Sequence, residues 1–403
     1  MRLAVVSPFV DRRHGTERAL AELLERLAFV YGCEIHLYAQ RVEDLRLANG
    51  QPARTAKPAV IIWHKVPSVA GPHIWQFLAW MFLNGFLRRW HTLVGRVSFD
   101  LVLSPGINCL HPDVVIVHAL FHRLRELSRE EPEISGPRAV FFRKWHRRAY
   151  YALLATLERR IYSRKSVILA AVSNRTAALL KKYFQREDVS LIPNGVNAAK
   201  FSLPARLSRR AQARHQRTFR DDDFVLLLIG NDWRVKGLPT LLEAMAALRG
   251  SPLHLLVVGN DAAEPFRSLA TQLGLQDRCR WELPSSDVLD FYAAADLYVS
   301  PSREDSFGLP VAEAMACGLP AITSIHAGVA DSIHDGVDGF VLRDPCNAQA
   351  LATLFERLAA DQDLCRKLGE AAAATSLDWN WDRSAAALWE LLKAAKEQRH
   401  PAG

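Results

Sequence analysis

Two carboxylates stand eight residues apart in the segment 301–320 (PSREDSFGLPVAEAMACGLP), where Asp305 precedes Glu313. A helix is expected to begin between them, and the amides of Gly308 and Leu309 at such a helix start can hold a phosphate with help from the helix dipole. The second carboxylate then suits the two hydroxyls of a ribose, and the first suits sugar hydroxyls. The same residues also fit a plain helix start whose glycine serves only packing, so the spacing alone leaves both interpretations open.

Two cations follow another predicted strand. Arg234 and Lys236 lie in the segment 230–237 (GNDWRVKG), directly after the apolar run Phe224–Ile229. Fixed cations at this position are suited to stabilise the negative charge of a bound phosphate. A lone exposed lysine is usually only solvated, so the order of the motifs has to support the phosphate role.

A histidine ends one strand of the first half. His118 follows the apolar run Val114–Val117, at the carboxyl edge where ligands bind in parallel sheets. A histidine at a strand end is often structural, and His122, four residues on, competes for the same role. The sequence therefore predicts His118 as a site residue, with His122 as the alternative.

The segment 301–320 resembles the E-x7-E signature of retaining GT-B glycosyltransferases, in particular glycosyltransferase family four. That family has the pattern E-x-F-G-x-x-x-x-E, and this chain has D-S-F-G-L-P-V-A-E. The departure is Asp305 at the position of the first glutamate, with Glu304 adjacent but out of register. A shorter carboxylate there can still reach a hydroxyl after a small backbone adjustment.

Three other segments are similar to family motifs in the same order. The segment 192–197 (IPNGVN) is similar to a P-N-G-V-D turn at the domain junction, although by itself it is a plain Asn-Gly turn. The 230–237 segment resembles a G-R-x-x-x-x-K-G loop, with Lys236 matching and Asn231 in place of the arginine. Gly15 falls within the place of a G-G-x-E loop near the N-terminus, where a glycine lets the backbone approach a ligand.

The resemblance implies a set of site residues and a reaction. The expected catalytic residues are His118, Asp305 and Lys236, and the expected donor-binding residues are Gly15, Arg234, Lys236, Phe307, Gly308, Leu309 and Glu313. The substrate is then a nucleotide-diphospho-sugar donor, transferred with retention of configuration to a glycan or glycolipid acceptor. We expect no metal and no cofactor, because Lys and Arg supply the positive charge and the leaving phosphate can accept the proton of the acceptor in a same-face transfer.

Other enzyme classes are less well supported by the residues. The acidic run Asp221–Asp223 matches a D-x-D metal motif but lies in a polar stretch, which favours a solvated turn. No G-x-G-x-x-G follows the first predicted strand, which argues against a nicotinamide or flavin enzyme. A nucleotide-sugar epimerase of the same architecture and a non-catalytic nucleotide-sugar-binding protein stay open as alternatives.

Strand and helix patterns alternate along the whole chain of 403 residues, which indicates an α/β protein with parallel sheets. We expect the GT-B architecture: two Rossmann-like doubly wound domains that face a cleft, with a C-terminal helix crossing back to the N-terminal domain. The expected boundaries are an acceptor-binding domain at 1–195, a linker at 196–223, a nucleotide-sugar-binding domain at 224–380 and the returning helix at 381–403.

Charge is distributed unevenly between the two halves. Residues 1–200 hold 30 basic and 16 acidic side chains, although the whole chain carries a net charge of only +8. The basic half also contains the Trp-rich stretch His73–Trp90 and the mixed stretch Phe141–Arg148, which favour an anionic acceptor and a peripheral contact with an anionic membrane. No nucleic-acid-binding motif accompanies the charge. Six cysteines without metal spacing favour reduced thiols, and we expect a cytoplasmic protein at the inner face of the membrane.

Overall fold

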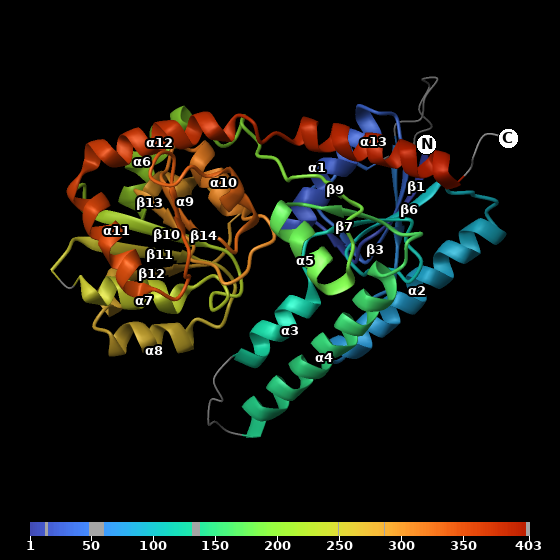
Figure 1. The fold of residues 1–403 in the computed structure, drawn as a ribbon, viewed down its shortest axis with the longest axis horizontal. Coiled ribbons are helices and arrows are strands. Elements are labelled where there is room, and N and C mark those ends of the chain that lie inside the picture. Colours follow the sequence, from blue (N-terminus) through green and yellow to red (C-terminus); the bar gives the residue numbers. More distant parts are fainter. Residues whose placement is uncertain (13–14, 48–59, 131–137, 249, 286, 400–403) are drawn as a thin grey trace. The chain divides into compact units, whose positions relative to one another are not determined.

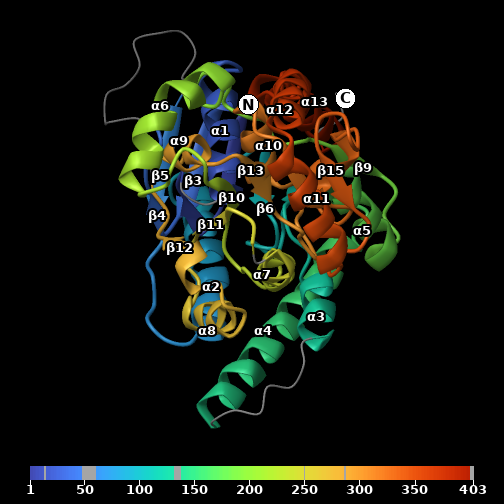
Figure 2. The ribbon, with the colours of Figure 1, turned by 90° about the vertical axis from the view of Figure 1, so that its left-hand side faces the viewer.

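The computed structural model describes residues 1–12, 15–47, 60–130, 138–248, 250–285 and 287–399, and it divides into two compact units. Unit 1 comprises Met1–Pro193 together with Asp382–Gly403, and unit 2 comprises Asn194–Trp381. Each unit is built around a parallel sheet with helices on its faces (Figures 1 and 2). The α/β class with two Rossmann-like domains is therefore confirmed.

Unit 1 contains a seven-stranded parallel sheet with the strand order β5-β3-β1-β6-β7-β8-β9. Its strands are β1 (Arg2–Val6), β3 (Glu34–Ala39), β5 (Val60–Lys65), β6 (Leu101–Pro105), β7 (Val114–Val117), β8 (Ile168–Ala171) and β9 (Val189–Leu191), and the short pair β2 (Phe9–Val10) and β4 (Arg41–Val42) lies apart. Its helices are α1 (Gly15–Phe29), α2 (His73–Leu93), α3 (Phe121–Glu130), α4 (Arg138–Tyr162), α5 (Asn174–Phe184) and α13 (Trp381–Arg399), the last of which belongs to this unit from Asp382 onward. The central strands β1 and β7 are almost wholly buried, as their unbroken apolar runs predict.

Unit 2 contains a six-stranded parallel sheet with the strand order β12-β11-β10-β13-β14-β15. Its strands are β10 (Phe224–Ile229), β11 (Leu253–Val258), β12 (Cys279–Glu282), β13 (Leu297–Val299), β14 (Ala321–Ser324) and β15 (Phe340–Leu342). Its helices are α6 (Leu203–Gln216), α7 (Leu238–Ala247), α8 (Glu264–Gln272), α9 (Leu289–Ala294), α10 (Leu309–Ala316), α11 (Ala348–Ala360) and α12 (Gln362–Ser376), with 3-10 turns at Gln276–Arg278 and Gly328–Ser332. The order places β10 beside β13, so the loops that follow these two strands meet at one edge of the sheet.

The stretch 196–223, which the sequence favours as a linker, contains the helix α6 over half of its length and belongs to unit 2. Ser202 caps α6 by accepting a hydrogen bond from the amide of Ala205, and Arg206, Arg210 and Arg214 follow one another at one-turn intervals. These arginines donate to unit 2: Arg206 Nε to the carbonyl of Cys317 at 2.8 Å and Arg210 Nη2 to a carboxylate oxygen of Asp296 at 2.5 Å. The buried face of α6 is thus cationic, which an apolar periodicity cannot reveal.

The acidic run at the end of the same stretch is only partly a solvated turn. Asp221 and Asp222 are exposed, but Asp223 is 5% exposed and accepts a hydrogen bond from the amide of Arg220 at 2.8 Å. Its backbone carbonyl accepts from Arg214 Nη2 at 2.7 Å. Asp223 therefore closes the turn that leads into β10.

Among the described residues, none of the helices combines the length and the apolar character that a bilayer-spanning segment requires.

Candidate active site

An ion pair joins the two loops that follow β10 and β13 in unit 2. Lys236 Nζ donates to Asp305 Oδ2, and the two side chains are 16% and 15% exposed. Gly230 lies against the lysine, because a Cβ at this glycine would stand 3.2 Å from Lys236 Cε. Two residues that the sequence nominated from distant motifs thus lie in direct contact.

Glycine at position 237 is required by the close approach of these two loops. Gly237 has a φ of +83°, and a Cβ there would lie 2.2 Å from the carbonyl oxygen of Pro301. The amide of Arg303 also donates to the carbonyl of Val235 at 2.7 Å. The backbone therefore holds the lysine-bearing loop and the aspartate-bearing loop in one arrangement.

The start of α10 presents backbone donors beside this ion pair. Gly308 has a φ of +94°, in the left-handed region that favours glycine, and its Cβ position lies 3.7 Å from Asp305 Oδ2. The amides of Gly308 and Leu309 donate to no acceptor among the described residues. Unpartnered N–H groups at a helix start are suited to bind an anion, and the phosphate role expected from the sequence stays a prediction.

Glu313 lies one turn into α10 and is 4% exposed. The hydroxyl of Tyr292 in α9 donates to Glu313 Oε2 at 2.8 Å, and this contact fixes the orientation of the carboxylate. Tyr298 on β13 donates to the carbonyl of Ile229 at 3.2 Å. Burial raises the pKa of Tyr298, and the charges of Asp305 and Glu313 raise it further, so both carboxylates act on one phenol.

The remaining residues of the 230–237 loop have separate roles. Asn231, which stands where the family has arginine, accepts a hydrogen bond from the amide of Asn260 at 2.9 Å and so ties two loops together. Arg234 is half-buried, its carbonyl accepts from the amide of Gly237 at 3.2 Å, and its guanidinium has no hydrogen-bond or ion-pair partner among the described residues. Its guanidinium is therefore available to a ligand. Phe307 is 6% exposed, and its carbonyl accepts from the amide of Val329 at 2.6 Å, which makes it a support for the start of α10.

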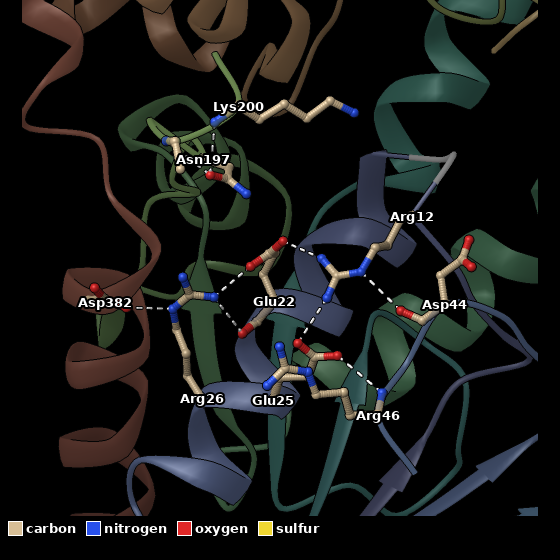
Figure 3. Close-up of polar contacts among 10 residues, drawn as sticks. Arg12, Glu22, Glu25, Arg26, Asp44, Arg46, Asn197, Lys200 and Asp382 are labelled. Atoms are coloured by element: carbon tan, nitrogen blue, oxygen red, sulfur yellow. Dashed lines mark hydrogen bonds and ion pairs between the residues drawn. The ribbon is translucent and has the colours of Figure 1, made fainter. Parts of the chain in front are cut away.

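The P-N-G-V-D-like segment forms a tight turn. Asn197 Oδ1 accepts hydrogen bonds from the amides of Ala199 and Lys200 at 3.1 and 3.3 Å (Figure 3). A Cβ at Gly195 would stand 2.3 Å from the amide nitrogen of Trp381, so this glycine permits the chain to cross the backbone ahead of α13. The segment has a structural role that explains its glycine.

In unit 1, His118 is the best-defined of the nominated residues. It is 8% exposed, its Nε2 has no hydrogen-bond partner, and burial lowers its pKa to about 4. The competitor His122 is committed elsewhere, because its Nδ1 lies 2.8 Å from Oε2 of the fully buried Glu158. The two histidines thus differ: Nε2 of His118 has no partner, whereas His122 is held by Glu158.

Gly15 is exposed and is the first residue of α1, whereas its neighbour His14 lies outside the described residues. Arg12, just before it, lies between Glu22 and Glu25 of α1 (Figure 3). Arg26 in turn joins Glu22 at 2.5 Å and Asp382 of α13 at 2.6 Å. This network fastens Arg12 and the C-terminal helix to α1.

Sequence reasoning missed Tyr292 and Tyr298. Both lie inside apolar runs that predict a helix and a strand, and nothing in those runs singles out the two tyrosines as site residues. A phenol in a buried run is a signal for a polar partner, since a buried hydroxyl is nearly always hydrogen-bonded.

Solved structures share this architecture over the full chain. The lipopolysaccharide-biosynthesis glycosyltransferase WaaG superposes with a TM-score of 0.75 at 20% identity, covering 99% of this chain and 100% of that one. HepE of Anabaena, solved in complex with UDP and glucose, gives 0.72 at 17% identity, covering 98% and 100%. The fold is accordingly GT-B, as expected.

Two family models match the two halves of the chain. Glycosyltransferase Family 4 matches residues 13–200, and Glycosyl transferases group 1 matches residues 209–375. The chain belongs to these family 4, group 1 glycosyltransferases.

Curated relatives match over shorter stretches. A D-inositol 3-phosphate glycosyltransferase of Xylanimonas cellulosilytica is 29% identical over 252 residues, which is 60% of each chain. The lipopolysaccharide glucosyltransferase WaaG of Escherichia coli is 29% identical over 214 residues, or 51% of this chain and 57% of that protein. The chain thus spans about three fifths of the length of these relatives.

Proposed function

We propose that the protein is a retaining glycosyltransferase that moves a sugar from a nucleotide-diphospho-sugar to a hydroxyl of a lipid-linked or cell-envelope glycan. The observation that carries this proposal is the arrangement in unit 2, where Lys236, Asp305 and the unpartnered amides of Gly308 and Leu309 lie at one sheet edge with Glu313 one turn beyond. A diphosphate and a ribose need this combination of donors, cation and carboxylate.

Each residue of this arrangement has a defined task in the proposed reaction. The amides at the start of α10, together with Lys236 and Arg234, hold the diphosphate and stabilise the charge that it gains as the sugar leaves. Glu313, oriented by Tyr292, accepts hydrogen bonds from the ribose hydroxyls. Asp305 orients the sugar once its lysine turns to the phosphate.

His118 supplies a neutral imidazole on the unit 1 side of the proposed reaction. A pKa of about 4 keeps the ring uncharged at neutral pH, so it can hydrogen-bond a sugar hydroxyl without repelling a developing positive charge at the reacting carbon. No carboxylate is assigned as a covalent nucleophile, and the leaving phosphate takes the proton of the acceptor.

The relatives support the choice of donor and acceptor class. HepE was solved with UDP-glucose, which makes this sugar nucleotide the first donor to test. The two WaaG matches concern lipopolysaccharide synthesis, which supports a cell-envelope acceptor. The epimerase and binding-only alternatives are not favoured, because the matched relatives carry transferase names.

Peripheral membrane contact is the proposed setting of the reaction, at the cytoplasmic face. One side of α2 exposes Trp75 by 66%, Phe82 by 71%, Phe86 by 53% and Trp90 by 53%, with ring pairs 82–86 and 86–90 stacked along the helix. The helix contains no acidic residue, and Arg89 is exposed on the same side. We name these five residues the α2 stripe. The other basic stretch, Phe141–Arg148, begins outside the residues whose side chains are described.

The test of the proposed activity follows nucleoside diphosphate release from UDP-glucose and other sugar nucleotides, with and without membrane extracts as acceptor. Release that depends on the extract supports the transferase. Conversion of the donor to an isomer without release would indicate the epimerase, and no turnover with any donor would indicate a binding protein.

Membrane contact is tested separately by flotation with vesicles of zwitterionic lipid, with and without anionic phosphatidylglycerol. The wild-type protein is expected to float with the anionic vesicles, and Phe82→Ser combined with Phe86→Ser is expected to abolish this. Equal flotation of the double variant would contradict the role of the α2 stripe.

A further inference from the structure

Unit 1 contains a cavity of about 310 Å³ at the carboxyl edge of its sheet, between α2 and α4. Its apolar walls come from both helices and from the loops after β6 and β7. The residues that form these walls are Phe77, Trp80, Ile107, Phe121, Tyr150 and Leu154. The volume is about twice the ~150 Å³ of an apolar cavity that accepts benzene, so it holds a group larger than one ring.

The walls of this cavity are fixed by contacts of their own. The ring of Tyr150 meets that of Phe77 edge to face at 6.2 Å between centroids, which joins α4 to α2. Trp80 is 2% exposed, and its indole nitrogen donates to the carbonyl of Asn108 at 3.1 Å. Because the rings are held by each other and by the backbone, the cavity is formed before any ligand enters.

The cavity is also lined by polar side chains, namely Thr16, Gln40, His73, Gln76, Asn108 and His118. His118 contributes to the wall, and its Nε2 is a buried nitrogen without a partner. Gly106 opens onto free space, since nothing lies within 4 Å of its Cβ position. Among the described residues of the wall, none is an aspartate, glutamate, lysine or arginine. A phosphate or carboxylate placed here would lose its water without gaining a counter-charge.

The helix that forms one wall also carries the α2 stripe on its other side. Phe77 and Trp80 face the cavity and core, whereas Trp75, Phe82 and Phe86 are exposed. A single helix therefore separates an apolar surface from an apolar cavity, and Figure 1 shows α2 and α4 as long neighbours. This arrangement suits a ligand that arrives from a lipid surface.

We propose that the cavity receives the hydrocarbon part of the acceptor, so that the acceptor is a glycolipid with an uncharged head next to the reacting hydroxyl, and not a phosphorylated polyol. The inference rests on the proposed transferase function and narrows its second substrate. It assigns His118 to the junction between the hydrocarbon and the hydroxyl that is glycosylated.

The test is calorimetric titration of the full chain, without donor, with octyl β-D-glucoside below its micelle concentration, with glucose and with glucose 6-phosphate. We expect binding of octyl glucoside alone, with the negative heat-capacity change of apolar burial. Ile107→Trp, which fills the cavity, is expected to weaken this binding at least tenfold, and Phe82→Ser on the exposed side of α2 is expected to leave it unchanged.

The controls distinguish a loss of octyl glucoside binding from misfolding of the variant and from failure of the proposed transferase function. Thermal unfolding of Ile107→Trp reports whether the variant is folded in unit 1, because the proposed nucleoside diphosphate site lies in unit 2 and its binding would not detect a defect in unit 1. Gln76→Glu, which adds a charge at the wall with little change of volume, gives a second reading with at least a fivefold loss expected. Binding that Phe82→Ser removes and Ile107→Trp retains would place the detergent on the α2 stripe and overturn the proposal. Preferential binding of glucose 6-phosphate would also overturn the proposal. The same holds if the protein transfers sugar but does not bind octyl glucoside.

Discussion

Replacing Lys236 by methionine should weaken nucleoside diphosphate binding by about 10- to 150-fold. The side chain is largely buried beside Asp305, so a phosphate that it contacts gains a charge-assisted hydrogen bond worth about 1.5–3 kcal/mol, and each 1.4 kcal/mol is about a factor of ten in Kd. The loss of affinity should lie near the upper end of this range, because Asp305 then faces the diphosphate without the positive charge of Lys236.

A double-mutant cycle separates these two effects. Asp305→Asn in the Lys236→Met background removes the unpaired carboxylate, and it should recover part of the lost affinity. Lys367→Met is the matched control, because this lysine is exposed and forms an ion pair with the exposed Asp363. Titration calorimetry with UDP and other nucleoside diphosphates at low salt measures the wild type, Lys236→Met, Asp305→Asn, the double variant and the Lys367→Met control. A Kd for Lys236→Met within twofold of wild type would refute the assignment of the lysine to the diphosphate.

Three further outcomes are expected. Tyr292→Phe should weaken nucleoside diphosphate binding by about 2- to 10-fold and leave inorganic pyrophosphate binding unchanged, because the lost contact orients Glu313 toward the ribose; equal losses for both ligands would speak against that role. Gly308→Ala should lower stability by about 1–2 kcal/mol because its φ is +94°, whereas Gly85→Ala inside α2 should raise it by about 0.5–1 kcal/mol, both measured by thermal unfolding. Burial lowers the pKa of His118 to about 4 in the folded protein, below its usual value, so folding favours the neutral ring. The contribution of His118 to the free energy of unfolding is therefore complete above about pH 6.5 and falls by up to about 3 kcal/mol as the pH drops through 4. His118→Gln should show a shallower loss of stability between these pH values, and an unchanged slope would contradict the burial argument.

The fold was accessible from the sequence wherever burial is decided by apolar side chains. The apolar run Phe224–Ile229 predicts both ends of β10 correctly, because a strand that is covered on both faces is apolar throughout. The helix α6 was missed because Arg206, Arg210 and Arg214 on one of its faces meet carbonyls and Asp296, and no hydropathy pattern marks such a face. The two-residue strands β2 and β4 were too short to leave any periodicity.

The candidate site was accessible only in part. The order of motifs nominated Lys236 and Asp305, and the adjacency of β10 and β13 explains why residues so far apart in the chain come into contact. The orienting role of Tyr292 depends on the packing of α9 against α10, which no local pattern reveals. The apolar cavity of unit 1 is assembled from residues spread between positions 8 and 154, so it exists only once the sheet and its helices have formed.

The most direct test of the proposed donor site is a crystal structure of the protein with a bound nucleoside diphosphate. We expect the ribose hydroxyls within hydrogen-bond distance of Glu313, and the diphosphate on the amides of Gly308 and Leu309 with Lys236 turned from Asp305 toward it. A nucleotide bound elsewhere, or a Lys236–Asp305 pair left intact beside an occupied site, would contradict the account.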